Sequence, residues 1–156
     1  MFIRKKRIGG KEYAYLIENK YNKRKKQSRQ RSTIYLGKVI NLGSADRQTV
    51  ASTVKEAIIN ELIRFGFTQE DDKLIREKVI VDLKSIEVKE SNRNICLEMN
   101  EGFLCNQTLT NLINFNSKDL NQKEIIHSFA NSFVSVGINL HHESFITIFT
   151  NIFKNS

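Results

Sequence analysis

The sequence predicts an α+β protein in which a basic, three-stranded antiparallel sheet is followed by a mainly helical domain with an inserted β-hairpin. Three observations support this prediction. Two strand-like runs meet at a pair of glycines, apolar residues recur at helical spacing from residue 47 onward, and positive charge is concentrated in the first forty residues. A break at 41–46 separates a β module of residues 1–42 from a domain of residues 47–156, whose hairpin covers about residues 78–99.

The N-terminal module begins with a hairpin. Residues 2–8 and 11–19 are strand-like and flank Gly9-Gly10. A two-residue turn of type I′ requires positive φ at both positions, which glycine adopts readily. Residues 32–40 form the third predicted strand.

The glycine turn also predicts the register of this hairpin. It places Ile8 opposite Lys11, and the pairing then continues to Phe2 opposite Ile17. With the third strand added, one consistent arrangement points four aliphatic side chains inward: Ile3, Leu16, Ile34 and Leu36. The opposite face then gathers tyrosines and cations: Tyr13, Tyr15, Tyr35, Arg4 and Lys6.

Between the second and third strands, residues 20–31 contain seven cations and no acid. A run of like charges repels itself and does not fold alone, so it predicts a mobile loop or an extended hairpin tip. The alternative is a solvated loop without a partner.

The remainder of the chain alternates between helical and strand-like patterns. Apolar spacing predicts helices at 47–65, 69–76, 102–115, 120–136 and 142–154, with Gly66 and Gly137 ending two of them. Strand-like runs at 78–89 and 94–99 are joined by Ser91-Asn92-Arg93.

Length and composition limit the class of protein. At 156 residues with 40% hydrophobic residues, the chain is long enough for a real core, which argues against disorder. Two cysteines do not make a disulfide framework, and a reduced cytoplasmic setting is expected. The N-terminus lacks the apolar region of a secretory signal, and no apolar run approaches the roughly 20 residues of a membrane span.

Charge is divided unevenly along the chain. Residues 1–40 hold thirteen Lys or Arg against two acids, a net charge of +11, whereas residues 41–156 carry a net charge of −3. This asymmetry favours a polyanionic partner, since Lys and Arg gain affinity by displacing phosphate counterions. Interleaved tyrosines suit unstacked bases, which favours RNA slightly over DNA, although core packing explains tyrosines in strands equally well. The candidate nucleic-acid-binding residues are Arg4, Lys6, Tyr13, Tyr15, Lys20, Lys23, Arg24, Lys25, Lys26, Arg29, Arg31, Tyr35 and Lys38.

The sequence predicts no catalytic residue, no cofactor and no metal site. The cysteines and histidines lack metal-ligand spacing, and Cys96 and Cys105 are expected to be small buried hydrophobic residues. Asp82 and Glu98, in predicted neighbouring strands, form the one plausible carboxylate pair, but neither has the companion Lys of a PD-(D/E)xK nuclease. Both are expected to be surface acids, and the protein is expected not to be an enzyme.

The last two predicted helices have the lengths of a helix-turn-helix unit. The final helix, however, is heavily apolar and has Lys154 as its single cation, so a packed core or a protein-binding surface is the better interpretation. A protein–protein adaptor, steered by the basic module, is therefore one alternative function. A small nuclease or a transposase-derived remnant is another.

Residues 4–39 resemble the basic leading segment of DDE-type insertion-sequence transposases, with Tyr35-Leu36-Gly37-Lys38 as the most recognisable part. They are also similar to leading segments of small uncharacterised archaeal proteins, as is the stretch 100–115. The 116 residues that follow are too few for a transposase catalytic domain, and no ordered DDE set is visible. The resemblance therefore implies contact with nucleic acid and not transposition.

Overall fold

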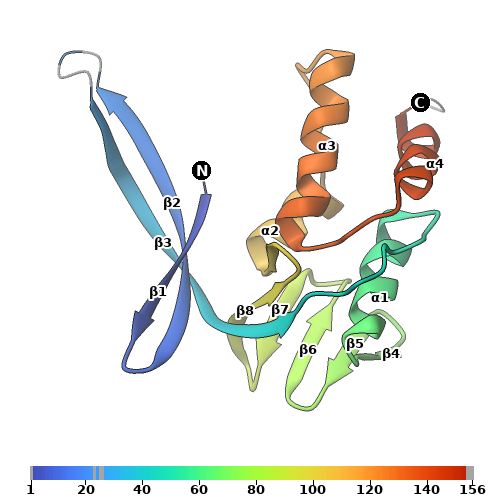
Figure 1. Ribbon diagram of the computed structural model, residues 1–156, viewed down its shortest axis with the longest axis horizontal. Coiled ribbons are helices and arrows are strands. Elements are labelled where there is room, and N and C mark those ends of the chain that lie inside the picture. Colours follow the sequence, from blue (N-terminus) through green and yellow to red (C-terminus); the bar gives the residue numbers. More distant parts are fainter. Residues whose placement is uncertain (1, 23, 25–26, 154–156) are drawn as a thin grey trace.

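The computed structural model describes residues 2–22, 24 and 27–153, and it describes the backbone alone at 19–22 and 27–32. The described residues form nine strands and four α-helices (Figure 1). The strands are β1 (Phe2–Ile8), β2 (Lys11–Asn22), β3 (Gln27–Gly43), β4 (Thr68–Glu70), β5 (Lys73–Arg76), β6 (Val79–Asp82), β7 (Glu87–Glu90), β8 (Arg93–Met99) and β9 (Gly102–Leu104). The helices are α1 (Val54–Arg64), α2 (Asn106–Ile113), α3 (Gln122–Val136) and α4 (His142–Phe153).

The predicted fold class is wrong. A separate three-stranded sheet followed by a helical domain does not form, because the strands join into one mixed sheet in the order β1-β2-β3-β8-β7-β6-β5-β4, with β9 also paired to β8. The junction is a parallel pairing of β3 with β8, in which Val39 lies opposite Cys96 and Ile40 lies opposite Leu97. The residues of this pairing belong to two core clusters, Leu97 and Ile40 to one and Val39 and Cys96 to the other, and apolar runs of this kind are typical of parallel strands.

One predicted helix does not form, and two others begin later than predicted. The helix predicted at 47–65 is α1 and starts at Val54. Residues 69–76 form the β4–β5 hairpin, whose turn places Asp71 at a φ of 54°. The predicted helix 102–115 divides into β9 and α2, with Cys105 at the N-cap. Residues 69–76 hold only two apolar residues, Leu74 and Ile75, too few to separate a helical period from a strand period. At 102–104 pairing with β8 decides the outcome.

Two local predictions are confirmed. The β1–β2 register runs from Ile8 opposite Lys11 to Phe2 opposite Ile17, with Gly9 and Gly10 at φ values of 59° and 82°. Helix α3 ends at Gly137, whose left-handed φ of 85° forms the C-cap. The predicted connection Ser91-Asn92-Arg93 is one residue shorter than expected: Ser91 and Asn92, both at positive φ, join β7 to β8, and Arg93 begins β8.

The helices share a core with the sheet. Ile58 and Leu62 of α1, Leu109 of α2 and Phe129 of α3 are buried together with Leu97 of β8. Helices α3 and α4 pack through phenylalanines, with the rings of Phe129 and Phe145 centred 5.8 Å apart. Of the two predicted roles of these helices, core packing is therefore observed, and a protein-binding surface stays a prediction. No helix in the described part of the chain is long and apolar enough to cross a membrane.

Candidate nucleic-acid interface

Three tyrosine rings gather on one face of the β1–β2–β3 part of the sheet. Tyr35 lies between the other two, with ring centres 5.4 Å from Tyr15 and 6.3 Å from Tyr13. The Tyr35 side chain is the most open, because the residue is 56% exposed, whereas Tyr13 and Tyr15 are half-buried. Arg4 pairs with Tyr15 and Lys6 with Tyr13 across β1 and β2, so both cations share this face. We call these five residues the tyrosine face.

A β-bulge adds Lys38 to the same face. Simple alternation along β3 would put Tyr35 and Lys38 on opposite sides of the sheet. The register shifts at Leu36, so that Tyr15 lies opposite Tyr35 while Tyr13 lies opposite Lys38. The sequence identified Lys38 as a candidate but offered no means of placing it beside the tyrosines.

The observed inward-facing side chains of this part of the sheet differ from the predicted ones. Ile3 and Leu36 do pack with the buried residues Ala14 and Cys96. Ile34 does not, since it is 54% exposed. Its place is taken by Val39, which the shifted register turns toward Ala14.

The two faces of this part of the sheet differ in charge. On the face opposite the tyrosines, the Lys5 ammonium is 2.8 Å from Glu98 and 3.2 Å from Glu12. The hydrogen bond to Glu98 is the main reason why the pKa of Lys5 is raised above its usual value. Lys5 is thus neutralised locally by acids.

On the tyrosine side Lys38 lies 4.0 Å from Glu90, whereas three other cations have no acid partner in the described part of the chain. Among the described residues, Arg4, Lys6 and Lys11 form no ion pair with an acid. The Lys6 ammonium instead lies 5.1 Å from the centre of the Tyr15 ring, a cation–π arrangement. Partial burial, and then the neighbouring Tyr13 and Tyr15, raise the pKa of Tyr35, so its hydroxyl is neutral near pH 7 and does not repel phosphate.

A pocket of about 530 Å³ opens where the tyrosine face meets the β7–β8 hairpin. Its lining residues are Lys11, Tyr13, Tyr35, Leu36, Lys38, Glu90, Arg93, Asn94 and Ile95. The residues from β7 and β8 were not predicted as site residues. Strand-like patterns were predicted at 78–89 and 94–99, but such patterns carry no information on which strand pairs with β3.

The β2–β3 hairpin continues beyond this pocket as a two-stranded arm (Figure 1). The arm passes the last β1 pair, Phe2 with Ile17, and its backbone pairs Lys20 with Arg29. Much of the predicted basic loop is therefore an extended hairpin, which was one of its two predicted forms. Arg31 lies within β3, Arg24 is exposed in the turn, and Lys23, Lys25 and Lys26 lie outside the described residues.

The carboxylates considered for a nuclease do not form a pair. Strand β7 lies between β6, which carries Asp82, and β8, which carries Glu98. Asp82 accepts hydrogen bonds from the backbone N–H groups of Lys84 and Ser85, at 2.9 and 3.2 Å, and so caps the β6–β7 turn. Glu98 is bound to Lys5. The prediction that they lie in neighbouring strands is wrong, because residues 78–89 form two strands and not one.

The cysteines are buried, as predicted, with Cys96 0% and Cys105 1% exposed. The β8–β9 register, which pairs Leu97 with Leu104, brings the two thiols close to one another. Hydrogen bonds from Cys96 and then from Thr108 and Gln107 of α2 lower the pKa of Cys105. The hydrogen bond to Cys105, and then burial, raise the pKa of Cys96. In the described part of the chain, no three His, Cys, Asp or Glu side chains are grouped so that they could hold a metal ion.

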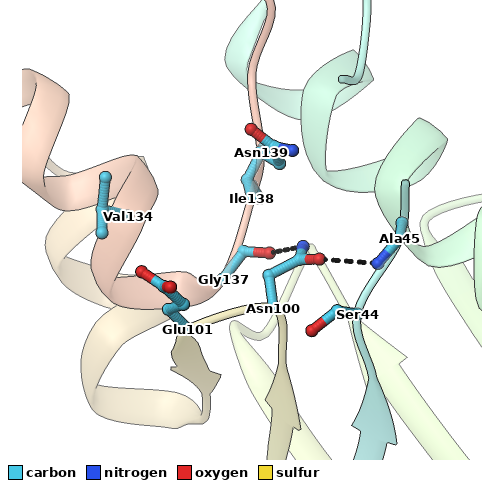
Figure 2. Close-up of a pocket in the computed structure, with 8 residues that line it drawn as sticks. All are labelled: Ser44, Ala45, Asn100, Glu101, Val134, Gly137, Ile138 and Asn139. Atoms are coloured by element: carbon cyan, nitrogen blue, oxygen red, sulfur yellow. Dashed lines mark hydrogen bonds between the residues drawn. The ribbon is translucent and has the colours of Figure 1, made fainter. Parts of the chain in front are cut away.

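A second cavity, of about 360 Å³, lies where the β3–α1, β8–β9 and α3–α4 connections meet (Figure 2). The Asn100 side chain accepts a hydrogen bond from the Ala45 N–H at 2.9 Å and donates to the carbonyl of Gly137 (Figure 2). It also donates to the buried carboxylate of Glu61. The other oxygen of Glu61 accepts from Thr49, which also accepts from Arg64. Each of these groups has a partner within the protein, so the network explains the joining of the sheet to α1 and α3 without a ligand.

Comparison with protein-family models, with curated proteins and with solved structures finds no match to this chain. The resemblance of residues 4–39 to transposase leading segments therefore stays a prediction. The tyrosine face and its neighbouring pocket are the features of the molecule that point to a function.

Proposed function

We propose that this protein binds single-stranded nucleic acid, RNA in preference to DNA, and does so without catalysing a reaction. The tyrosine face is the observation that supports the proposal most strongly. It combines three close aromatic rings, one of them 56% exposed, with Arg4 and Lys6, which no described acid neutralises. Aromatic side chains on a sheet that stack unpaired bases, with cations that track the backbone, are a recurrent way to bind single strands.

In this proposal the contacts are divided between rings and cations. Bases stack on Tyr35 and its two neighbours, while Arg4, Lys6 and Lys38 contact the phosphates on either side. The basic β2–β3 arm extends the positive surface beyond the sheet. Its cations then supply affinity that depends on charge and not on base identity.

Charge in the arm is expected to control affinity. Replacing Lys23, Lys25, Lys26 and Arg29 with Gln should weaken binding to an oligouridine RNA. The slope of log K against log salt concentration should also become less steep, by up to about 0.7 for each lost contact on single strands or about 0.9 on duplex DNA. Fluorescence anisotropy across a salt series measures both quantities. Stability should change little, because the described part of the arm has no flanking strand.

A matched control removes the same charge from elsewhere. Lys78, Lys84, Lys118 and Lys123 are exposed and belong to the other half of the molecule. Their replacement with Gln lowers the net charge equally but should leave most of the affinity. Equal losses in the two quadruple variants would show that overall charge, and not the arm, governs binding.

Binding without catalysis is proposed because the candidate carboxylates have other roles. Asp82 caps a turn, and Glu98 forms an ion pair with Lys5. A divalent-metal nuclease needs such oxygens free and close together.

A protein–protein adaptor is the second candidate. Four aliphatic residues of α3 and α4 are between 41% and 56% exposed: Ile126, Val134, Ile146 and Ile152. A protein partner at these C-terminal helices would cover them. If the unaltered protein shows no affinity for any single strand, this candidate replaces the first.

A further inference from the structure

The pocket beside the tyrosine face contains a feature that phosphate binding does not explain. The pocket is lined by three cations, Lys11, Lys38 and Arg93, and also by one carboxylate, that of Glu90. A carboxylate repels phosphate and therefore lowers the affinity of the pocket for anions. It is, however, the natural acceptor for N–H groups on the edge of a base.

The Glu90 carboxylate has unused capacity to accept hydrogen bonds. Its side chain is 32% exposed, and the Lys38 ammonium is 4.0 Å away, beyond hydrogen-bond distance. Among the described residues, none donates a hydrogen bond to it. A ligand with two adjacent N–H donors would satisfy both oxygens.

Glu90 is also held in a fixed place. It ends β7 opposite Arg93 of β8, and the turn between them is the tight pair Ser91-Asn92 at φ values of 48° and 68°. The parallel β3–β8 pairing then sets this hairpin beside Tyr35, with buried Ile95 in the pocket wall. The carboxylate and the stacking rings therefore belong to one site.

We propose that this pocket takes one unstacked guanine base from a single strand lying on the tyrosine face, with Glu90 accepting from the N1–H and the 2-amino group of that base. This inference rests on the proposed function. The volume, about 530 Å³, lies within the range of small-ligand sites. The rings of Tyr13 and Tyr35 are tilted by 43° with centres 6.3 Å apart, so the base stacks on one ring and does not slide between two.

Guanine is favoured over the other bases by the pattern of its pairing edge. Its N1–H and 2-amino group present two donors side by side, which match the two oxygens of a carboxylate. On the same edge adenine and cytosine present an amino group beside a ring-nitrogen acceptor, and uracil presents one N–H between two carbonyl acceptors. Each of these places a lone pair against a carboxylate oxygen.

The test uses nine-nucleotide RNAs that differ at the central position only: all uridine, one guanosine, or one inosine, which lacks the 2-amino group. The unaltered protein should bind the guanosine RNA roughly 10- to 100-fold more tightly than the uridine RNA, with the inosine RNA between them. Glu90→Gln should remove this preference while leaving the affinity for the uridine RNA within about 3-fold, because stacking and phosphate contacts are kept. Glu87→Gln is the matched control, since Glu87 lies in the same strand, pairs with Lys89 and is not in the pocket.

The outcomes separate this inference from the proposed function. Binding of the uridine RNA without a guanosine preference overturns the guanine pocket and leaves single-strand binding in place. A Glu90→Gln variant that binds all three RNAs more tightly, by the same factor, also overturns it, because the carboxylate then acts only by repelling phosphate. Failure to bind any of the RNAs contradicts the proposed function itself. Circular dichroism of each variant shows that folding is retained.

Discussion

Gly37→Ala is expected to destabilise the protein by about 2–5 kcal/mol, because the added methyl group meets the backbone of the neighbouring strand. Gly37 has a φ of +137°, and a Cβ at this position would lie 2.4 Å from the Asn94 carbonyl oxygen and 2.8 Å from the Ile95 Cα. Backbone atoms of a paired strand cannot move aside as a flexible side chain does. The β3–β8 pairing must therefore open, and the free energy of unfolding from urea titrations, followed by circular dichroism, should fall.

Gly43→Ala is the control for this measurement. Gly43 also has a positive φ, of +88°, but no atom lies within 4 Å of its expected Cβ. Its substitution should cost only the backbone strain, about 1 kcal/mol. If the two variants lost equal stability, β3 and β8 would not approach each other as described, and the single mixed sheet would be in doubt.

Tyr35→Ala is expected to weaken binding of single-stranded RNA by about 1–3 kcal/mol, roughly 5- to 150-fold, because one stacking ring is lost. Affinity for a duplex of equal length should fall much less, since paired bases do not expose their faces. Tyr35 is 56% exposed, so thermal unfolding should shift little. Anisotropy titrations with both substrates measure the difference.

Tyr35→Phe is the matched variant for stacking. It keeps the ring and removes only the hydroxyl, so single-strand affinity should remain within a few-fold of the unaltered protein. Equal losses of Tyr35→Ala on single strands and duplex, or a cooperative loss of folding, would mean that the tyrosines serve packing and not base contact.

The sequence allowed good prediction where a specific local signal, such as a glycine at positive φ, determines the feature. Gly9-Gly10 specifies a turn type, and the turn then fixes every pair of the β1–β2 hairpin. Gly137 ends α3 for an equally local reason, its left-handed conformation. The grouping of Tyr13 and Tyr15 with Arg4 and Lys6 followed from the same register.

Features that depend on distant residues could not be predicted in this way. The parallel pairing of β3 with β8 joins segments separated by a helix and four strands, and apolar periodicity does not identify a strand's partner. The bulge at Leu36 moves Lys38 to the tyrosine side, and no residue in Tyr35-Leu36-Gly37-Lys38 signals that shift except the glycine. The pocket was missed for this reason, since Glu90 and Arg93 reach the tyrosines only through that pairing.

Photo-crosslinking would locate the surface on which single strands bind, and we expect that surface to be the tyrosine face. The protein would be irradiated with an RNA containing 4-thiouridine, and the attachment sites would be mapped by mass spectrometry of the digested complex. Crosslinks are expected in the segments 11–20 and 33–38, which hold Tyr13, Tyr15 and Tyr35, and they should be lost when unlabelled oligouridine competes. Crosslinks confined to α3 and α4, or crosslinks unchanged in Tyr35→Ala, would contradict the account.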